Sequence, residues 1–150
     1  MSGLFKSMLL AASCCLLLAA SPAGAADLKS PDDIKTCLRI LMQVTNDFER
    51  QIDRQTYQRL AHENMEFTEG VEALNDTLAG EDAGLRDSVT PAIQKAADAA
   101  QHVADLRDSN DEGKLRAAQA DMVTAVKAVF AFFPEDLRPD PNVQPGHVQH

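Results

Sequence analysis

Aromatic side chains and cysteines are scarce in this chain of 150 residues. It has no tryptophan, one tyrosine and three cysteines, of which Cys14 and Cys15 lie in an apolar N-terminal run. If that run is removed, Cys37 is left without a partner and no intramolecular disulfide can form. We therefore expect Cys37 to be buried as a small apolar side chain, with an intermolecular disulfide as the alternative.

The motifs of several common chemistries are also missing. The sequence has no Cys-x-x-Cys, no His-x-x-x-His and no glycine-rich phosphate loop. Di-iron bundles need Glu-x-x-His pairs, but the residues three before His62 and His102 are Arg59 and Ala99. No serine lies at a spacing that suggests a nucleophile–base pair. The sequence thus predicts a non-enzymatic protein with no catalytic residues.

Positive charge is in short supply. Beyond residue 25 there are 13 Lys and Arg side chains against 23 Asp and Glu, a net charge of −10. Such a surface repels phosphate backbones and anionic lipids, which argues against nucleic-acid binding. An acidic surface favours solubility, and the alternative is that it attracts a basic partner or cations.

The first 25 residues have the features of a secretory signal. Lys6 supplies a positive start, Met8–Ala20 is apolar but short, and Ala23 and Ala25 form an A-x-A cleavage pattern. We expect cleavage after Ala25 and a bacterial periplasmic destination. The alternative is a lipobox ending at Cys14, which would make that cysteine a lipidated N-terminus.

Two helical segments are predicted in the first half of the remaining chain. Ser30 as N-cap and Pro31 at the first helical position mark the start of the first one. Its apolar residues recur every three or four positions: Ile34, Cys37, Leu38, Leu41, Val44, Phe48 and Ile52. The second spans about 55–79, with the stripe Tyr57, Leu60, Ala61, Phe67, Val71, Leu74 and Leu78. No glycine or proline separates the two, so one long bent helix is the alternative.

Two more helices are predicted in the second half. Thr90 and Pro91 look like the start of the third, after a break at 79–84, and its stripe is Ile93, Ala96, Ala97, Ala100 and Val103. After a turn at 107–113 the fourth helix ends at Pro134, and its stripe is Leu115, Ala118, Met122, Ala125, Val126, Val129 and Phe133. We predict an all-α fold: signal peptide 1–25, antiparallel four-helix bundle 26–134 and disordered Pro-rich tail 135–150. No segment of the bundle is apolar all round, so none is expected to span a membrane.

Candidate ligand-binding residues cluster on the second helix. The cluster comprises His62, Glu63, Met65, Glu66 and Glu69. A soft cation such as copper or nickel suits His62, Met65 and Glu66, whereas a harder one prefers carboxylates. The plainer interpretation is a solvated face opposite Tyr57 and Leu60.

A b-type haem needs two inward axial ligands on different helices. Met42 or Met65 with His102 are the candidates in this sequence. Methionine in a helix is more often a core residue, and the plainer interpretation of His102 is a partly buried structural histidine. His147 and His150 lie in the predicted tail and are assigned no role.

The stretches "DLKSPDDIK" (27–35) and "EGKLRAAQADMV" (112–123), with the four amphipathic helices, carry a family resemblance. The chain resembles the periplasmic four-helix-bundle cytochromes, the cytochrome c′/c556 and cytochrome b562 group. In c-type members the last helix carries Cys-x-x-Cys-His. The matching positions here are Val126, Val129 and Phe130, so the resemblance implies the fold but not covalent haem. These side chains and Phe132 and Phe133 are expected to fill the space that haem would occupy.

The function expected from these features is a non-enzymatic periplasmic binding or accessory protein without a cofactor. Its expected partner is another protein, touching the exposed acids or the tail, or a metal ion; a homodimer is possible. The alternatives are an electron carrier with non-covalent haem and a periplasmic copper- or nickel-binding protein.

Overall fold

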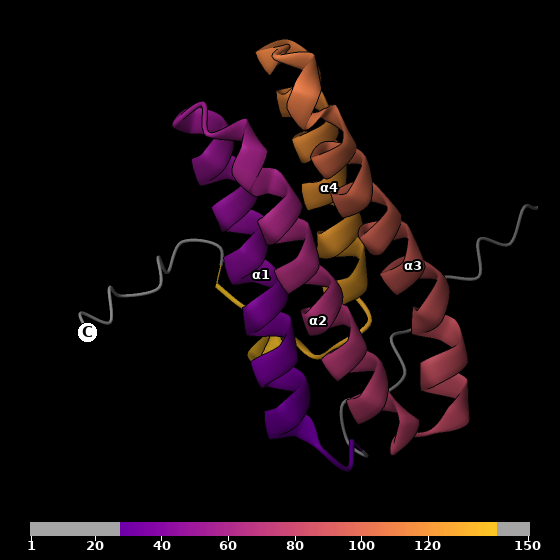
Figure 1. Cartoon of the computed structure of the whole chain (residues 1–150). Coiled ribbons are helices and arrows are strands. Elements are labelled where there is room, and N and C mark those ends of the chain that lie inside the picture. The colour runs from indigo at the N-terminus through magenta and orange to yellow at the C-terminus, as the bar shows by residue number, and fades with distance from the viewer. Residues whose placement is uncertain (1–27, 141–150) are drawn as a thin grey trace, which may run out of the picture.

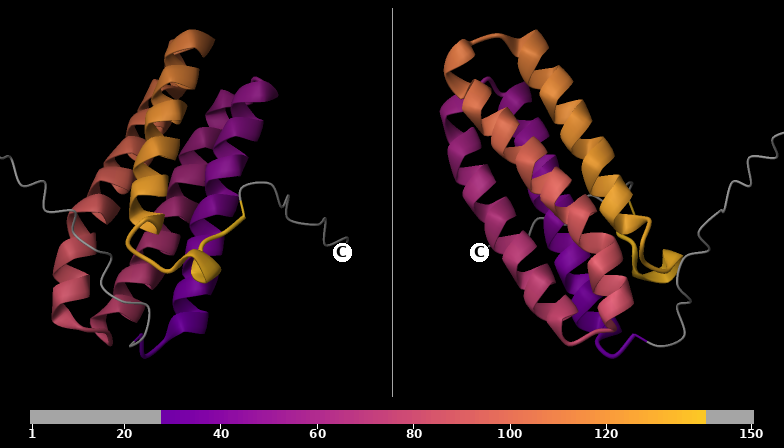
Figure 2. Two further views of the ribbon diagram at one scale, coloured as in Figure 1. Left: turned by 180° about the vertical axis from the view of Figure 1, so that it is seen from behind. Right: turned by 90° about the vertical axis from the view of Figure 1, so that its right-hand side faces the viewer.

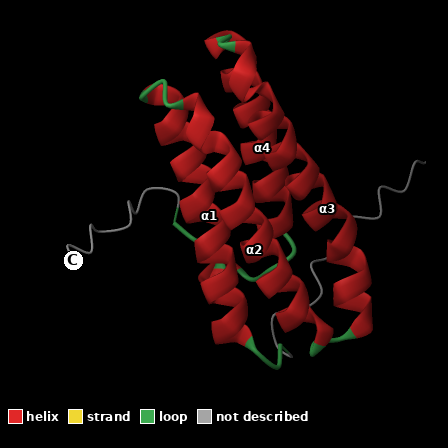
Figure 3. Cartoon of the chain, viewed as in Figure 1, coloured by secondary structure: helices red, strands yellow, loops and turns green. Residues whose placement is uncertain are grey.

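The computed structural model describes residues 28–140, and this part of the chain is all-helical (Figure 1, Figure 3). The long helices are α1 (Pro31–Asp53), α2 (Leu60–Ala79), α3 (Ala83–Asp105) and α4 (Glu112–Phe130). Short 3₁₀ helices lie between or after them: η2 (Tyr57–Arg59), η3 (Leu106–Ser109) and η4 (Glu135–Leu137). The predicted signal peptide, 1–25, lies outside the described residues.

The four long helices form a bundle in which consecutive helices run in opposite directions (Figure 2). Helix α1 packs against α2 and α4, and α3 packs against the same two helices. Short turns favour this order because they leave consecutive helices side by side. The predicted helical bundle is therefore confirmed. Between residues 28 and 140 no helix combines the length and apolar character needed to cross a membrane.

The core follows the predicted stripes closely in α1 and α4. Every stripe residue of those two segments is at most 6% exposed. The α2 stripe is less regular, because Ala61 is exposed and Tyr57 is only half-buried. Cys37 is buried as expected, and its Sγ lies 3.8 Å from Thr77 Oγ1.

Helices α1 and α2 are separate, and a left-handed residue divides them. Gln55 has φ 56°, its N–H donates to Ile52 O, and the N–H of Thr56 donates to Gln51 O at 2.9 Å. This pair of bonds is a Schellman motif, which normally places glycine at the left-handed position. The long bent helix is therefore excluded. Gln55 occupies the left-handed position at which glycine is usual.

Replacing Gln55 by glycine should raise the free energy of unfolding by about 0.5–1 kcal/mol, because a side chain in the left-handed region is strained. Urea denaturation followed by circular dichroism measures the change. Asn110, at φ 49°, is the matched control. Asparagine tolerates this conformation, so Asn110→Gly should have a smaller effect. Equal gains at both positions would contradict the strain at Gln55.

The predicted start of the third helix at Thr90 is wrong. Helix α3 begins at Ala83, and the side chain of Asp82 accepts from the N–H of Gly84 at 2.8 Å and of Leu85 at 3.3 Å. Pro91 lies inside the helix on its exposed side. Water can therefore reach the carbonyl that loses its partner, and the helix continues through the proline.

The predicted disorder of the tail is wrong for residues 135–140. Helix η4 returns to α1, where Leu137 is 7% exposed (Figure 2). Arg138 Nε donates to Phe133 O at 2.8 Å, which satisfies a carbonyl just beyond the end of α4. The fourth helix itself ends at Phe130, before the expected Pro134. Residues 141–150 lie outside the described range.

Candidate functional site

The residues proposed as haem ligands do not share an interior position. Met42 is half-buried against the core, Met65 is 54% exposed, and His102 is exposed on α3. The expectation of a partly buried His102 is therefore wrong. Val126, Val129, Phe130 and Phe133, which were expected to fill the core in place of haem, are all 5% exposed or less, while Phe132 is half-buried. These side chains form part of the core.

The residues proposed for a soft cation come together only in part. His62 Nε2 lies 3.2 Å from Glu66 Oε1, and both side chains are roughly half exposed, at 53% and 42%. Met65 is on the exposed side of the same helix. Glu69 is exposed as well, as the solvated-face interpretation predicts, but Glu63 is not.

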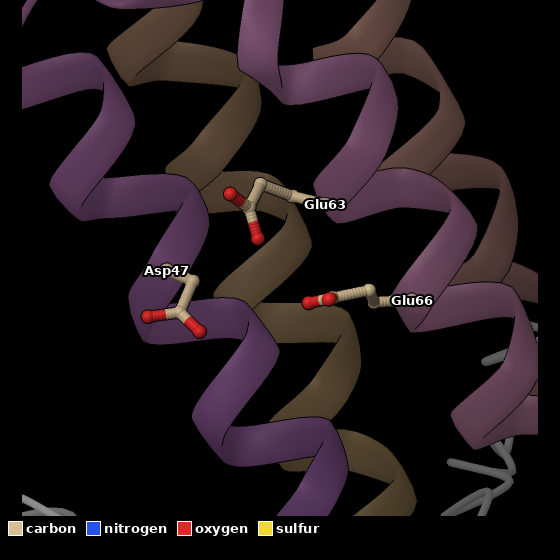
Figure 4. A group of neighbouring side chains, drawn as sticks. All are labelled: Asp47, Glu63 and Glu66. Atoms are coloured by element: carbon tan, nitrogen blue, oxygen red, sulfur yellow. The ribbon is translucent and has the colours of Figure 1, made fainter. Parts of the chain in front are cut away.

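Glu63 departs most from the expected arrangement, because it is 4% exposed. It lies beside Asp47 of α1 and Glu66 of α2, and one oxygen from each of these three carboxyl groups lies within 4.8 Å of the others (Figure 4). We call Asp47, Glu63 and Glu66 the carboxylate site. Sequence reasoning included Glu63 and Glu66 but missed Asp47 on the neighbouring helix.

A neutral hydrogen-bond chain holds Glu63 in place. Gln51 Nε2 donates to Glu63 Oε1 at 2.8 Å, and Gln51 Oε1 accepts from Thr56 Oγ1 at 2.6 Å. Gln51 is itself 7% exposed. The chain connects α2 to the end of α1 and to the turn that follows, so the carboxylate site is fixed to the α1–α2 hairpin.

The local environment raises the pKa of Glu63 above its ordinary value. Burial is the main cause, since it disfavours the charged form, while the hydrogen bond from Gln51 opposes it. The nearby Asp47 and Glu66 raise the pKa further, and His62 lowers it slightly. Two ionised carboxylates whose oxygens lie 4.8 Å apart repel by roughly 3 kcal/mol at an effective dielectric constant of about 20.

Asp47 has charge compensation from its own helix. Arg50 Nη1 forms an ion pair with Asp47 Oδ1, and the Asp47 side chain is 15% exposed. That oxygen is buried and accepts no aligned hydrogen bond. The site thus contains one carboxylate paired with Arg50, one beside His62, and Glu63, which is hydrogen-bonded to a neutral amide.

Carboxylate oxygens so close together can hold either a shared proton or a hard cation. A cation would require Glu63 to be ionised in its buried position. The burial of Glu63 and the two neighbouring carboxyl groups raise its pKa and favour the proton, although the hydrogen bond donated by Gln51 opposes them. The arrangement offers no nucleophile–base pair.

A signal in the sequence could have revealed the buried position of Glu63. Between Leu60 and Phe67 the predicted stripe contained only Ala61, which is exposed, and a helix needs a residue three or four positions after Leu60 to continue the buried face. Glu63 stands at that place, three after Leu60 and four before Phe67. A charged residue at an inward position indicates either a pair or a shifted pKa.

A second feature of α2 is an exposed acidic stripe. It consists of three acids, Glu69, Glu72 and Asp76, with Met65 at one end. All four are exposed, and they are spaced by four, three and four positions. They therefore lie along one line of the helix surface, about 16 Å long. Helix α2 contains no lysine or arginine, so no cation on the helix offsets these charges.

Comparison with known proteins gives no relative: no family model, no curated protein and no solved structure matches the chain.

Proposed function

We propose that this chain is a non-enzymatic helical-bundle protein of the bacterial periplasm that acts by binding a basic segment of another protein. The acidic stripe of α2 supports this proposal most directly. Like charges three or four positions apart destabilise a helix by about 0.2–0.5 kcal/mol per pair. The acidic stripe therefore destabilises α2, and a bound basic segment would relieve this repulsion.

Two further features support the proposal. Residues 1–25 have the pattern of a cleaved signal, which supports the periplasmic location. The positions at which the resembling cytochromes attach haem carry buried valine and phenylalanine. These buried side chains support a bundle that is filled without haem and binds through its surface charges.

Met65 gives the acidic stripe an apolar contact point at one end. Its side chain is 54% exposed, and methionine adapts to varied partner surfaces. A partner segment with Lys or Arg at helical spacing and one apolar residue would complement the stripe. Such contacts between exposed charges weaken with added salt.

The test is a photo-crosslinking residue placed at Met65 in cells. A discrete adduct with one protein is expected, and Glu69→Gln, Glu72→Gln and Asp76→Asn together should reduce its yield about tenfold or more, at up to 1 kcal/mol for each exposed pair. The combined variant should also melt at a higher temperature than the wild type, because the repulsion along α2 is gone.

The matched control removes three acids elsewhere: Asp87→Asn, Asp98→Asn and Asp121→Asn, on α3 and α4. It changes the net charge equally, so the adduct should persist. An adduct lost equally in both variants would contradict a specific stripe and leave only a net-charge effect. A Soret band in the purified protein at near-equal stoichiometry would contradict the cofactor-free proposal.

A further inference from the structure

The carboxylate site places one buried acid beside two other carboxyl groups, so its net charge depends on pH. Its central residue, Glu63, is buried, and its one described hydrogen bond comes from the neutral amide of Gln51. The neighbouring carboxyl groups come from two helices, Asp47 from α1 and Glu66 from α2 (Figure 4). Charge on Glu63 therefore acts across the α1–α2 contact and not within one helix alone.

We propose that the carboxylate site is a proton-operated latch, which holds the α1–α2 hairpin closed while Glu63 keeps its proton and loosens it when that proton passes to solvent. The bond broken is the O–H of the Glu63 carboxyl group, and water or a buffer base takes the proton. The buried carboxylate that remains faces two like charges, and separating α1 from α2 relieves the repulsion.

The other charged groups around Glu63 do not cancel this repulsion. Arg50 acts through its ion pair with Asp47, and His62 stands 3.2 Å from Glu66. From α3 the described polar contact at this end of α2 is neutral, since Asn64 Nδ2 donates to Gln101 Oε1. Arg50 and His62 thus contact Asp47 and Glu66, and the described side-chain hydrogen bond to Glu63 remains that of Gln51.

The hydrogen-bond chain gives the latch a mechanical connection to the turn. Gln51 bonds Glu63 on one side and Thr56 on the other, next to the strained residue Gln55. When α2 moves away from α1, the hydrogen bond from Gln51 to Glu63 breaks, and the end of α1 loses this contact with α2. We expect the loosening to be confined to the turn and the helix ends next to it, 45–67.

The direction of the pH effect follows from the folded state. Because the pKa of Glu63 is raised above the ordinary 4.5, the folded protein binds this proton more tightly than the unfolded chain does. The stabilisation is complete below the ordinary value and is lost as the pH rises through the folded pKa. This is the opposite of a salt-bridged carboxylate, whose contribution is lost on acidification.

The test compares amide hydrogen exchange in 45–67 for the wild type and Glu63→Gln at matched pH, from about pH 5 to about pH 8. Glutamine keeps an oxygen for Gln51 and cannot ionise. The ratio of wild-type to variant protection should fall as the pH rises over this range, because only the wild type loses a proton at residue 63. Asp121→Asn, which removes an exposed acid of α4 outside the acidic stripe, should match the wild type at every pH.

Two further variants examine the neighbours. Glu66→Gln removes a like charge and should move the transition to lower pH, whereas His62→Gln removes the opposing influence and should move it slightly the other way. The carboxyl carbon resonance of Glu63 in labelled wild-type protein should titrate in the same range as the exchange. This measurement decides the matter even if Glu63→Gln fails to fold.

Three results would overturn the latch. The first is a Glu63 resonance that titrates at or below the ordinary glutamate value. The second is a Glu63→Gln profile that matches the wild type at every pH. The third is restored protection when Ca²⁺ is added to the wild type at high pH, because the site would then hold a cation in place of the proton.

Discussion

Replacing Phe133 by alanine should lower the free energy of unfolding by about 3–5 kcal/mol, the usual loss for a fully buried phenylalanine. Phe133 is 0% exposed and ranks among the largest fully buried side chains. It lies just after α4, where Arg138 Nε donates to its carbonyl. The loss should therefore exceed the transfer free energy of the ring, because the surrounding side chains collapse only in part.

Phe132→Ala is the matched control, since the neighbouring ring is half-buried. Its cost should be about 1 kcal/mol, near the average of point substitutions. Urea denaturation followed by circular dichroism gives both values. Similar losses for the two variants would show that the segment after α4 is not packed into the core, which would contradict a bundle filled by its own side chains.

The positions of the stripes in α1 and α4 could be read from the sequence, because helical periodicity reports which face is buried. Ile34, Phe48 and Ile52 in α1 and Leu115 and Val129 in α4 are all 1% exposed or less, as predicted. Apolar residues at steps of three and four over such a length all lie on one face of a helix, so the spacing defines which face is buried. The same pattern indicated the helical segments, but it left open whether the first two form one helix, which the turn at Gln55 decides.

The helix boundaries were predicted less well, because local rules do not see tertiary contacts. Pro91 resembles a first helical residue, but Asp82 caps α3 nine residues earlier and the exposed side tolerates the proline. Gln55 carries no turn signal, and the Schellman bonds are seen only in the structure. One apolar residue, Leu137, has no periodicity, so the sequence could not indicate that η4 packs against α1.

The candidate site depended on a contact between helices, which no spacing within one helix reveals. Glu63 and Glu66 were visible as acids on the second segment, but Asp47 is sixteen positions before Glu63 on another helix. Only the packing of α1 on α2 brings Asp47 beside them. The same packing buries Glu63, so both the cluster and its raised pKa are tertiary properties.

Replacing Glu81 by alanine should lower the free energy of unfolding by roughly 3 kcal/mol, because two hydrogen bonds to a charged group are lost at about 1.5–3 kcal/mol each, in part replaced by water. Glu81 is 6% exposed in the turn between α2 and α3. Its Oε1 accepts from the N–H of Ser30 at 2.7 Å and its Oε2 from the N–H of Lys29 at 2.9 Å. Lys29 Nζ returns a bond to Gly80 O.

Ser30 provides the matched control, because the sequence predicts it as the cap of α1. It occupies that position, but its side chain makes no capping hydrogen bond. Ser30→Ala should therefore cost far less than the usual 1 kcal/mol of a lost N-cap. Glu81→Gln should fall between the two, since an amide keeps one acceptor but turns its NH₂ towards a backbone donor.

Hydrogen exchange at the first turn of α1 separates this clamp from a general loss of stability. In Glu81→Ala the amides at the start of α1 should exchange faster, while those of α4 follow only the global unfolding free energy. A large cost for Ser30→Ala with little for Glu81→Ala would contradict the clamp. Because Glu81 belongs to a turn 51 residues away, the start of α1 is set by the α2–α3 connection more than by its own sequence.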